Sequence, residues 1–176
     1  MDDSRELPGL DISPEPPGSE LATTLLSAYF DELRRRFPGG FDPDLALAAR
    51  DEELVAPNGT FLVARVEARA VGCGALRKLE SMTAEVKHMW VDPAARGRGV
   101  GRALLGALED AARVLGCTAA RLDTSSHLPE ALRLYRSSGY LETVPYNDNL
   151  YAHHWFEKRL GPGGARRDLT MGGVQP

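Results

Sequence analysis

The residues best suited to chemistry form a glycine- and arginine-rich turn between an apolar segment and an amphipathic one. The turn consists of Arg96, Gly97, Arg98, Gly99, Val100 and Gly101. Glycines let the backbone approach an anion closely, and a helix that begins at the turn offers unpaired amides and the positive end of its dipole. The two arginines add charge-assisted donors. The sequence therefore predicts a binding site for phosphate.

Two widespread phosphate motifs do not fit this turn. A dinucleotide fold requires G-x-G-x-x-G, but the third glycine falls on Arg102 when counted from Gly97 and on Leu104 when counted from Gly99. A nucleotide P-loop requires G-K-[ST], which the turn lacks. Asp123 lies at roughly the right distance downstream for a ribose-binding acid, but without the glycines this spacing carries little weight.

The turn instead contains R-x-x-G-x-G, from Arg96 to Gly101, after a segment that ends in V-D-P. This pattern resembles the acyl-CoA-binding motif of the GNAT (Gcn5-related N-acetyltransferase) superfamily. The resemblance implies that the six residues of the turn bind acetyl-CoA, with their amides around the pyrophosphate. The alternative is an ordinary glycine-rich turn between a strand and a helix.

A second segment, from Ala131 to Tyr140, matches the GNAT pattern A-x-x-L-Y-x-x-x-G-[FY] at every fixed position. The resemblance implies that Tyr135 lies beside the sulfur of coenzyme A and acts as general acid toward the leaving thiolate. A phenol with an ordinary pKa near 10 is protonated at neutral pH and can donate that proton. The alternative is a core aromatic residue whose hydroxyl finds a partner.

One position departs from the family pattern. Many members carry an asparagine three residues before the alanine, where its amide holds the pantetheine arm, but this chain has Leu128. Either Ser126 or His127 replaces that hydrogen bond, or the contact is absent. The resemblance also implies that pantetheine pairs with the backbone from Met89 to Val91 and that the Val91 amide polarises the acetyl carbonyl.

Glu85 is the leading candidate for the base that deprotonates the attacking amine. In several GNAT enzymes a glutamate at the matching place on this strand takes the proton, often through water. Partial burial would raise its pKa toward a useful range. The alternative is a surface glutamate paired with Lys87 on the same strand face.

Histidines are weaker candidates. His153 and His154 are adjacent on a predicted strand, so their side chains point to opposite faces and cannot chelate one metal ion. One of them is an alternative base, although a structural role is the commoner fate of such residues. No metal is expected.

The acceptor site is expected at the first two helices and at a late loop. The resemblance places Tyr29 and Phe37 on the helical side of its mouth, and Tyr146 and Asp148 on the loop. Asp148 would pair with the ammonium of a small amine, whereas the arginines at 34–36 would instead receive a carboxylate. The alternatives are an ordinary Asn/Asp turn and a solvated helix face.

The elements that position these residues follow from hydrophobic periodicity and from capping signals. Strands are predicted at 10–12, 61–66, 70–76, 85–91, 119–123, 141–144 and 151–156. Helices are predicted from Ser19, from Asp42-Pro43, after the glycine-rich turn, and over 129–137. This order predicts an α/β protein with the GNAT fold, in which a mixed central sheet of six to seven strands is flanked by four helices.

Composition sets the remaining expectations. The 176 residues suit a single domain over residues 1–160, and the Gly-, Pro- and Arg-rich residues 161–176 are expected to form a flexible tail. A net charge of −4 argues against a nucleic-acid partner. The two cysteines lack metal-ligand spacing, and no apolar stretch is long enough to cross a membrane. A cytoplasmic protein is expected.

The functional expectation is an N-acetyltransferase that moves the acetyl group of acetyl-CoA directly to a primary amine of a small molecule. Amino acids, polyamines and aminoglycoside-like compounds are the candidate acceptors, and homodimer formation is left open. Two alternatives remain. One is a non-catalytic acyl-CoA-binding regulator with the same fold, and the other is a protein or peptide N-acetyltransferase.

Overall fold

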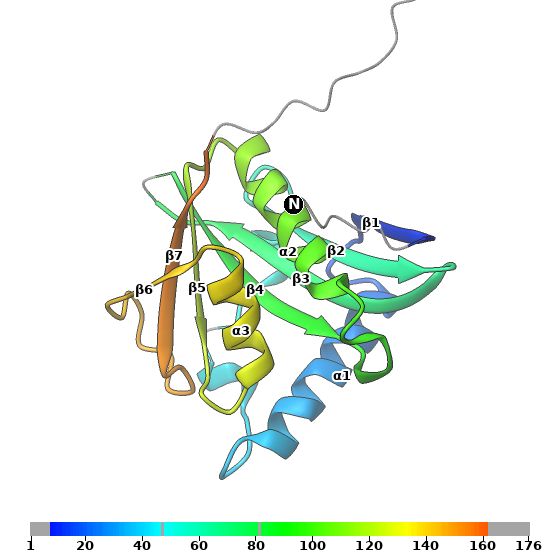
Figure 1. The fold of residues 1–176 in the computed structure, drawn as a ribbon, viewed down its shortest axis with the longest axis horizontal. Coiled ribbons are helices and arrows are strands. Elements are labelled where there is room, and N and C mark those ends of the chain that lie inside the picture. The colour runs from blue at the N-terminus through cyan, green and yellow to red at the C-terminus, as the bar shows by residue number, and fades with distance from the viewer. Residues whose placement is uncertain (1–7, 47, 81, 162–176) are drawn as a thin grey trace, which may run out of the picture.

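The computed structural model describes residues 8–46, 48–80 and 82–161, which form one seven-stranded mixed sheet with three α-helices (Figure 1). The strands are β1 (Leu10–Pro14), β2 (Gly59–Val66), β3 (Arg69–Lys78), β4 (Thr83–Val91), β5 (Ala119–Thr124), β6 (Leu141–Thr143) and β7 (His154–Arg159). The helices are α1 (Glu20–Arg36), α2 (Val100–Val114) and α3 (Pro129–Ser137).

The sheet has the strand order β1-β2-β3-β4-β5-β7-β6. Every neighbouring pair is antiparallel except β4 and β5, which α2 connects as a parallel crossover. This arrangement confirms the predicted α/β class and the predicted strand number. Within the described residues, none of the helices has the length and apolar character needed to cross a bilayer.

The expectation of four helices is wrong. Asp42 does act as an N-cap, because its side chain accepts from the Asp44 amide, but the helix that follows is a single 3₁₀ turn, Pro43–Leu45. Leu45 is half exposed. Without a buried apolar stripe the segment lacks the tertiary packing that stabilises a longer helix.

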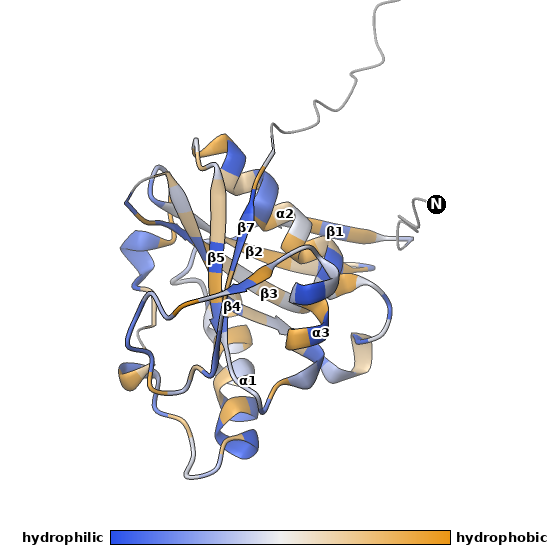
Figure 2. Ribbon diagram, turned by 60° about the vertical axis from the view of Figure 1, so that its left-hand side comes forward, coloured by the Kyte–Doolittle hydropathy of each residue, from blue (hydrophilic) through white to orange (hydrophobic). Residues whose placement is uncertain are grey.

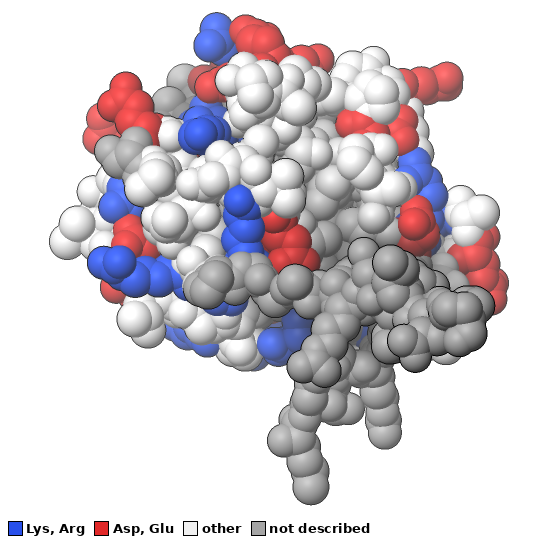
Figure 3. Space-filling model, turned by 90° about the horizontal axis from the view of Figure 1, so that it is seen from above, with Lys and Arg blue, Asp and Glu red and all other residues white. Residues whose placement is uncertain are grey.

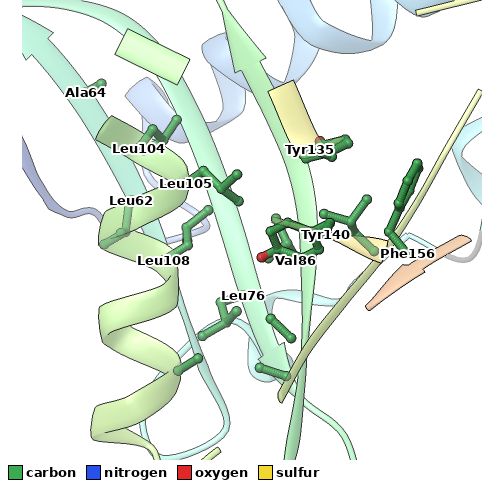
Figure 4. Close-up of a cluster of buried hydrophobic side chains, with 14 of the residues drawn as sticks. Leu62, Ala64, Leu76, Val86, Leu104, Leu105, Leu108, Tyr135, Tyr140 and Phe156 are labelled. Carbon is green, nitrogen blue, oxygen red and sulfur yellow. The ribbon is translucent and has the colours of Figure 1, made fainter. Parts of the chain in front are cut away.

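Helices α2 and α3 cover one face of the sheet, and α1 covers the other. The apolar stripe of α2 packs on β2, β3 and β4, and α3 adds Tyr135 to the same core (Figure 4). Hydrophobic and hydrophilic residues alternate around α1, which buries only one side (Figure 2). Truncating a buried leucine of α2 would cost about 2–5 kcal/mol, so this core anchors the glycine-rich turn that precedes the helix.

Strands β4 and β5 pair over only three residues. The paired positions are Thr83 with Ala119, Ala84 with Ala120, and Glu85 with Arg121. Beyond Glu85 the two strands separate, so β4 keeps its hydrogen bonds to β3 but loses its neighbour on the other side. The fold thus contains a gap inside the sheet, next to the residues that sequence analysis singled out.

A β-bulge in β4, next to this gap, changes the direction in which the side chains of β4 point. Cys73 pairs with Trp90 and Ala75 pairs with Lys87, so Gly74 alone lies opposite both His88 and Met89. His88 takes up the extra residue with a φ of +55°, a left-handed conformation that is uncommon outside glycine. The bulge puts Lys87 and His88 on the α1 side of the sheet, where His88 contacts Tyr29 and Phe30.

Candidate active site

Two hollows meet at the gap between β4 and β5. A groove of about 340 Å³ runs along the end of β4, the glycine-rich turn and α3. A smaller cavity of about 90 Å³ lies under α1, between β4 and the end of β5. Met89, Ala131 and Tyr135 line both hollows, so a ligand that extends along the groove can reach the cavity at these residues.

The glycine-rich turn forms an anion cradle at the outer end of the groove. Gly97 and Gly99 have φ angles of +74° and +86°, and Gly99 is the N-cap of α2. Within the described part of the chain, the amides of residues 97–102 have no hydrogen-bond partner. A Cβ atom added at either glycine would meet nothing within 4 Å. The turn is therefore open, lined by donors, and suited to a pyrophosphate at the positive end of a helix.

The arginines of the turn do not all point at this cradle. Arg96 folds back, donating from Nε to the Val91 carbonyl over 2.9 Å and from Nη2 to Glu32 over 2.6 Å. It lines the groove but is tied to α1. Arg98 is exposed and lines a separate hollow with Arg69 and Asp92. The cradle therefore depends on backbone amides more than on these two side chains.

Tyr135 lies at the junction of groove and cavity and is buried. Its ring packs against Tyr140 and Phe156 (Figure 4). Burial, together with the negative charge of Asp123, raises the pKa of the phenol well above its ordinary value. Tyr135 is therefore protonated at neutral pH and can donate a proton at the place where the two hollows meet.

The cavity has aromatic walls and a polar floor. Tyr29 and Phe37, which were expected at the acceptor site, line it, as do Phe30, Phe41 and Tyr151, which the sequence did not single out. Phe41 contacts Phe30, Phe37 and Tyr151, with ring centroids 4.8–5.7 Å apart. Tyr151 is held by its hydroxyl, which accepts from the Asp42 amide over 2.9 Å. Such walls suit an acceptor with an apolar or aromatic substituent.

Buried ionic groups form the floor of the cavity. Lys87 Nζ lies 3.7 Å from Glu85 and 3.8 Å from Asp123, and all three side chains are at most 8 % exposed. Arg77 donates to Glu85 over 2.6 Å. Arg77 also donates to Glu53 over 3.1 Å. Glu85 and Asp123 thus each have a cationic neighbour, which is how buried charges are tolerated. Lys87 and Asp123 line the cavity, whereas Glu85 lies outside its lining residues.

His88 also lines the cavity. Burial lowers the pKa of its imidazole to about 3, and the positive charges of Lys87 and Arg77 act in the same direction. It is therefore neutral at physiological pH. No feature of the sequence marks a bulge at this residue, and its ring position was not predicted.

The family assignment follows from comparison with known proteins. Residues 12–140 match the model of the acetyltransferase (GNAT) family. This chain belongs to the GNAT family. It is an acetyl-CoA-dependent acetyltransferase, as are the enzymes for which the family is named.

Several relatives of this GNAT protein are known. It is 34% identical over 141 residues to a protein named IAA acetyltransferase from Azospirillum brasilense, covering 80% of this chain and 90% of that one. It is 36% identical over 112 residues to N-alpha-acetyltransferase RimI of Mycobacterium tuberculosis, covering 62% and 68%. A GNAT acetyltransferase structure from Elizabethkingia anophelis with acetyl-CoA bound shares the fold, with a TM-score of 0.63, 18% identity, and 86% and 99% coverage.

Several residues that sequence analysis placed in the GNAT site lie elsewhere. Ser126 lies outside the residues that line the two hollows, and its Oγ contacts His154 over 3.0 Å while its amide donates to His153. Tyr146 donates to Glu85 over 3.1 Å, beneath the floor. Asp148 is exposed and does not line the cavity. The loop contributes Asn149 instead, two residues before Tyr151.

The remaining expectations have mixed outcomes. Met89 and Val91, whose backbone is expected to pair with pantetheine, line the groove. The arginine of 34–36 that approaches the site, Arg36, is paired with Glu32 and Glu130. Acidic and basic side chains are interspersed on the described part of the face in Figure 3, without a broad patch of one sign. Most of the expected tail, residues 162–176, lies outside the described residues.

Proposed function

We propose that this acetyltransferase acetylates a primary amine of a small molecule. The observation that carries the proposal is the shared boundary of the two hollows, at Met89, Ala131 and Tyr135. The acceptor cavity is small, is covered by α1 and the segment that follows it, and has both an acid and a lysine in its floor. These features suit a compact molecule with one amine better than they suit an extended peptide.

The glycine-rich turn would hold the pyrophosphate of acetyl-CoA with the amides of residues 97–102. The end of β4, from Met89 to Val91, would align the pantetheine arm along the edge that β5 leaves unpaired. The Val91 amide would face the acetyl carbonyl, where a fixed donor stabilises developing negative charge. The cradle at Gly97 and Gly99 is open, so it has room for the pyrophosphate that these roles require.

Acetyl-CoA supplies an activated acetyl thioester, and the protein has to place it and move protons. Tyr135 is the proposed general acid, because its phenol is protonated and lies where groove and cavity join. It would give its proton to the departing sulfur. Glu85, paired with Arg77 and outside the cavity lining, is proposed to position Lys87 rather than to contact the acceptor.

The test is release of free thiol from acetyl-CoA in the presence of amines, amino acids, polyamines, aminoglycosides and a peptide with a free N-terminus. We expect release that depends on a small amine. Tyr135→Phe should lower kcat by about 10²-fold or more, because general acid catalysis typically contributes that much. Its dissociation constant for acetyl-CoA should stay unchanged.

Tyr140→Phe is the matched control. Its ring contacts that of Tyr135, but Tyr140 lines neither hollow, so kcat should be retained. Full activity of Tyr135→Phe with a confirmed acceptor would contradict the assigned role. Release only with the peptide would instead indicate an N-alpha-acetyltransferase, the activity for which the RimI relative is named.

A further inference from the structure

Asp123 stands out among the acidic residues of the molecule, and no role has yet been given to it. We propose that the Asp123 carboxylate binds the amine of an acceptor with an aromatic substituent and takes the first proton from its nitrogen. The inference rests on the proposed function and names the acceptor class and the base for that same site.

Asp123 lies in the cavity where the acceptor is expected. Among the described residues, Asp123 is the one carboxylate that lines the acceptor cavity. It lies near the end of β5, past the point where β5 leaves β4. Tyr29 and Tyr135 line the same cavity, and the charge of Asp123 contributes to raising the pKa of both phenols. An amine held by Asp123 is therefore beside the proposed acid.

Two asparagines hold the Asp123 carboxylate. Asn149 donates to Oδ1 over 2.7 Å and Asn147 donates to Oδ2 over 2.8 Å. Lys87 lies 3.8 Å from Oδ2, beyond hydrogen-bond distance. A carboxylate has about four lone-pair sites, two on each oxygen, so Oδ1 and Oδ2 can each accept from one further donor. The asparagines fix the orientation of Asp123, and its open sites are left for the acceptor.

Glu85, the other candidate base, is occupied by its own partners. Glu85 Oε2 accepts from Arg77 over 2.6 Å, and Oε1 accepts from Tyr146 over 3.1 Å. Its side chain is 1 % exposed and lies outside the cavity lining. Lys87 lies between Glu85 and Asp123 and contacts both carboxylates. An acceptor amine in the cavity would reach Asp123 without disturbing any of these contacts.

The aromatic walls specify the rest of the acceptor. Phe37, Phe41 and Tyr151 are clustered on the side of the cavity formed by α1, the segment after it and the late loop. An apolar ring can pack there while its amine reaches the floor. A ring attached through one methylene to the amine, as in benzylamine, has one apolar and one cationic end to match these two surfaces.

The acceptor ammonium loses two protons during the reaction. Asp123 takes one proton from the acceptor ammonium and passes it to solvent, which leaves a lone pair on nitrogen. The nitrogen–carbon bond forms as the carbon–sulfur bond breaks, and Tyr135 Oη gives its proton to sulfur. The second proton that leaves nitrogen restores Tyr135. One amide, one thiol and one released proton result.

The test compares benzylamine, which is protonated at pH 7, with O-benzylhydroxylamine, which has a similar shape and is neutral at that pH. Asp123→Asn should lower kcat/KM for benzylamine by about 10²-fold. For the neutral acceptor the loss should stay within about tenfold, because no proton has to be removed before attack. Asp148→Asn, at an exposed acid of the late loop, should change neither value.

Several outcomes overturn the inference. Equal losses with both acceptors would show that Asp123 supports the fold and does not act on the proton. A larger loss of kcat/KM for benzylamine with Glu85→Gln than with Asp123→Asn would indicate that Glu85 is the base. Thiol release with other amines but not with benzylamine would contradict the proposed aromatic acceptor class. Failure with every amine would instead remove the proposed function.

A binding measurement covers the case in which Asp123→Asn does not fold. In the wild-type protein with coenzyme A bound, benzylamine should bind at least about tenfold more tightly than benzyl alcohol, which has no positive charge for Asp123 to pair with. Equal dissociation constants for the two compounds would contradict the inference.

Discussion

Arg36, in the last turn of α1, and Glu130, in the first turn of α3, form an ion pair in which Arg36 Nη2 donates to Glu130 Oε2 over 3.0 Å. The same guanidinium donates to the His127 carbonyl over 2.8 Å and to Glu32 over 3.0 Å. The pair thus joins helices that lie on opposite faces of the sheet. Glu130 also lines the groove.

Arg36→Ala should therefore destabilise the protein by about 1 kcal/mol, the upper end for a partly exposed ion pair, and should weaken acetyl-CoA binding. Urea denaturation and titration calorimetry measure the two effects. Arg34→Ala is the control, since its ion pair with Asp31 lies within α1 and is about half exposed. Equal losses of stability in the two variants would contradict a role for the connection between α1 and α3.

Gly99→Ala should weaken acetyl-CoA binding through the cradle. Gly99 and Gly116 bracket α2, have φ angles of +86° and +79°, and both have space for a Cβ atom. Alanine at either position should cost about 1–2 kcal/mol of stability, because both require the left-handed conformation. Only Gly99→Ala should also raise the dissociation constant for acetyl-CoA, as Gly116 lies at the far end of the helix. A similar rise in Gly116→Ala would contradict this placement.

Gly74 keeps the end of β4 in place. A Cβ atom there would lie 2.8 Å from Leu108 Cδ1 and 2.9 Å from Met89 Sδ, so Gly74→Ala must displace both side chains. We expect a loss of about 1–3 kcal/mol from overpacking, together with weaker acetyl-CoA binding, because Met89 lines the groove. Gly106→Ala on α2 is the control, since nothing lies within 4 Å of its added Cβ atom. The Gly106→Ala variant should be at least as stable as the wild-type protein.

His88 should make the protein less stable in mild acid. Its pKa falls from 6.5 to about 3 in the native state through burial first, and then through Lys87 and Arg77. Below pH 6.5 the imidazole of His88 therefore binds a proton in the unfolded chain but not in the native state. The free energy of unfolding falls as the pH decreases toward 3. The contribution is absent above pH 6.5 and amounts to about 2 kcal/mol at pH 5.

His88→Asn removes this titration while keeping a side chain that tolerates positive φ. Between pH 7.5 and pH 5 the variant should lose about 2 kcal/mol less stability than the wild-type protein does. Urea denaturation at the two pH values measures the difference. Identical losses in the two proteins would show that the native imidazole accepts a proton as readily as the unfolded one.

Local patterns in the sequence predicted the elements well where a residue acts through its neighbours in the chain. Ser19 caps α1 by accepting from the Ala22 amide, and Gly139 closes α3 with a φ of +85°. The glycine-rich turn likewise forms the start of α2. Each of these signals depends on backbone geometry within a few residues, which single-sequence rules describe.

The acceptor site was harder to predict because its residues come from separate elements. Asp123 and His88 lie in one cavity only because β4 bulges and β5 diverges from it. Neither event leaves a mark in hydrophobic periodicity. The Tyr146–Asn149 loop was placed at the mouth, but Tyr146 turns inward to Glu85 and Asn149 binds Asp123. Which member of a loop reaches a cavity depends on tertiary packing that the loop itself does not encode.

The short pairing between β4 and β5 has a thermodynamic consequence. Past Glu85 the inner edge of β4 lacks a strand partner, and in the described chain the amides of residues 97–102 lack hydrogen bonds. A ligand that supplies acceptors there binds the native state and finds no such site on the unfolded chain. At a hundred times its dissociation constant it adds about 2.7 kcal/mol to the free energy of unfolding. The melting temperature of this protein is therefore expected to depend on the concentration of the ligand as well as on the sequence.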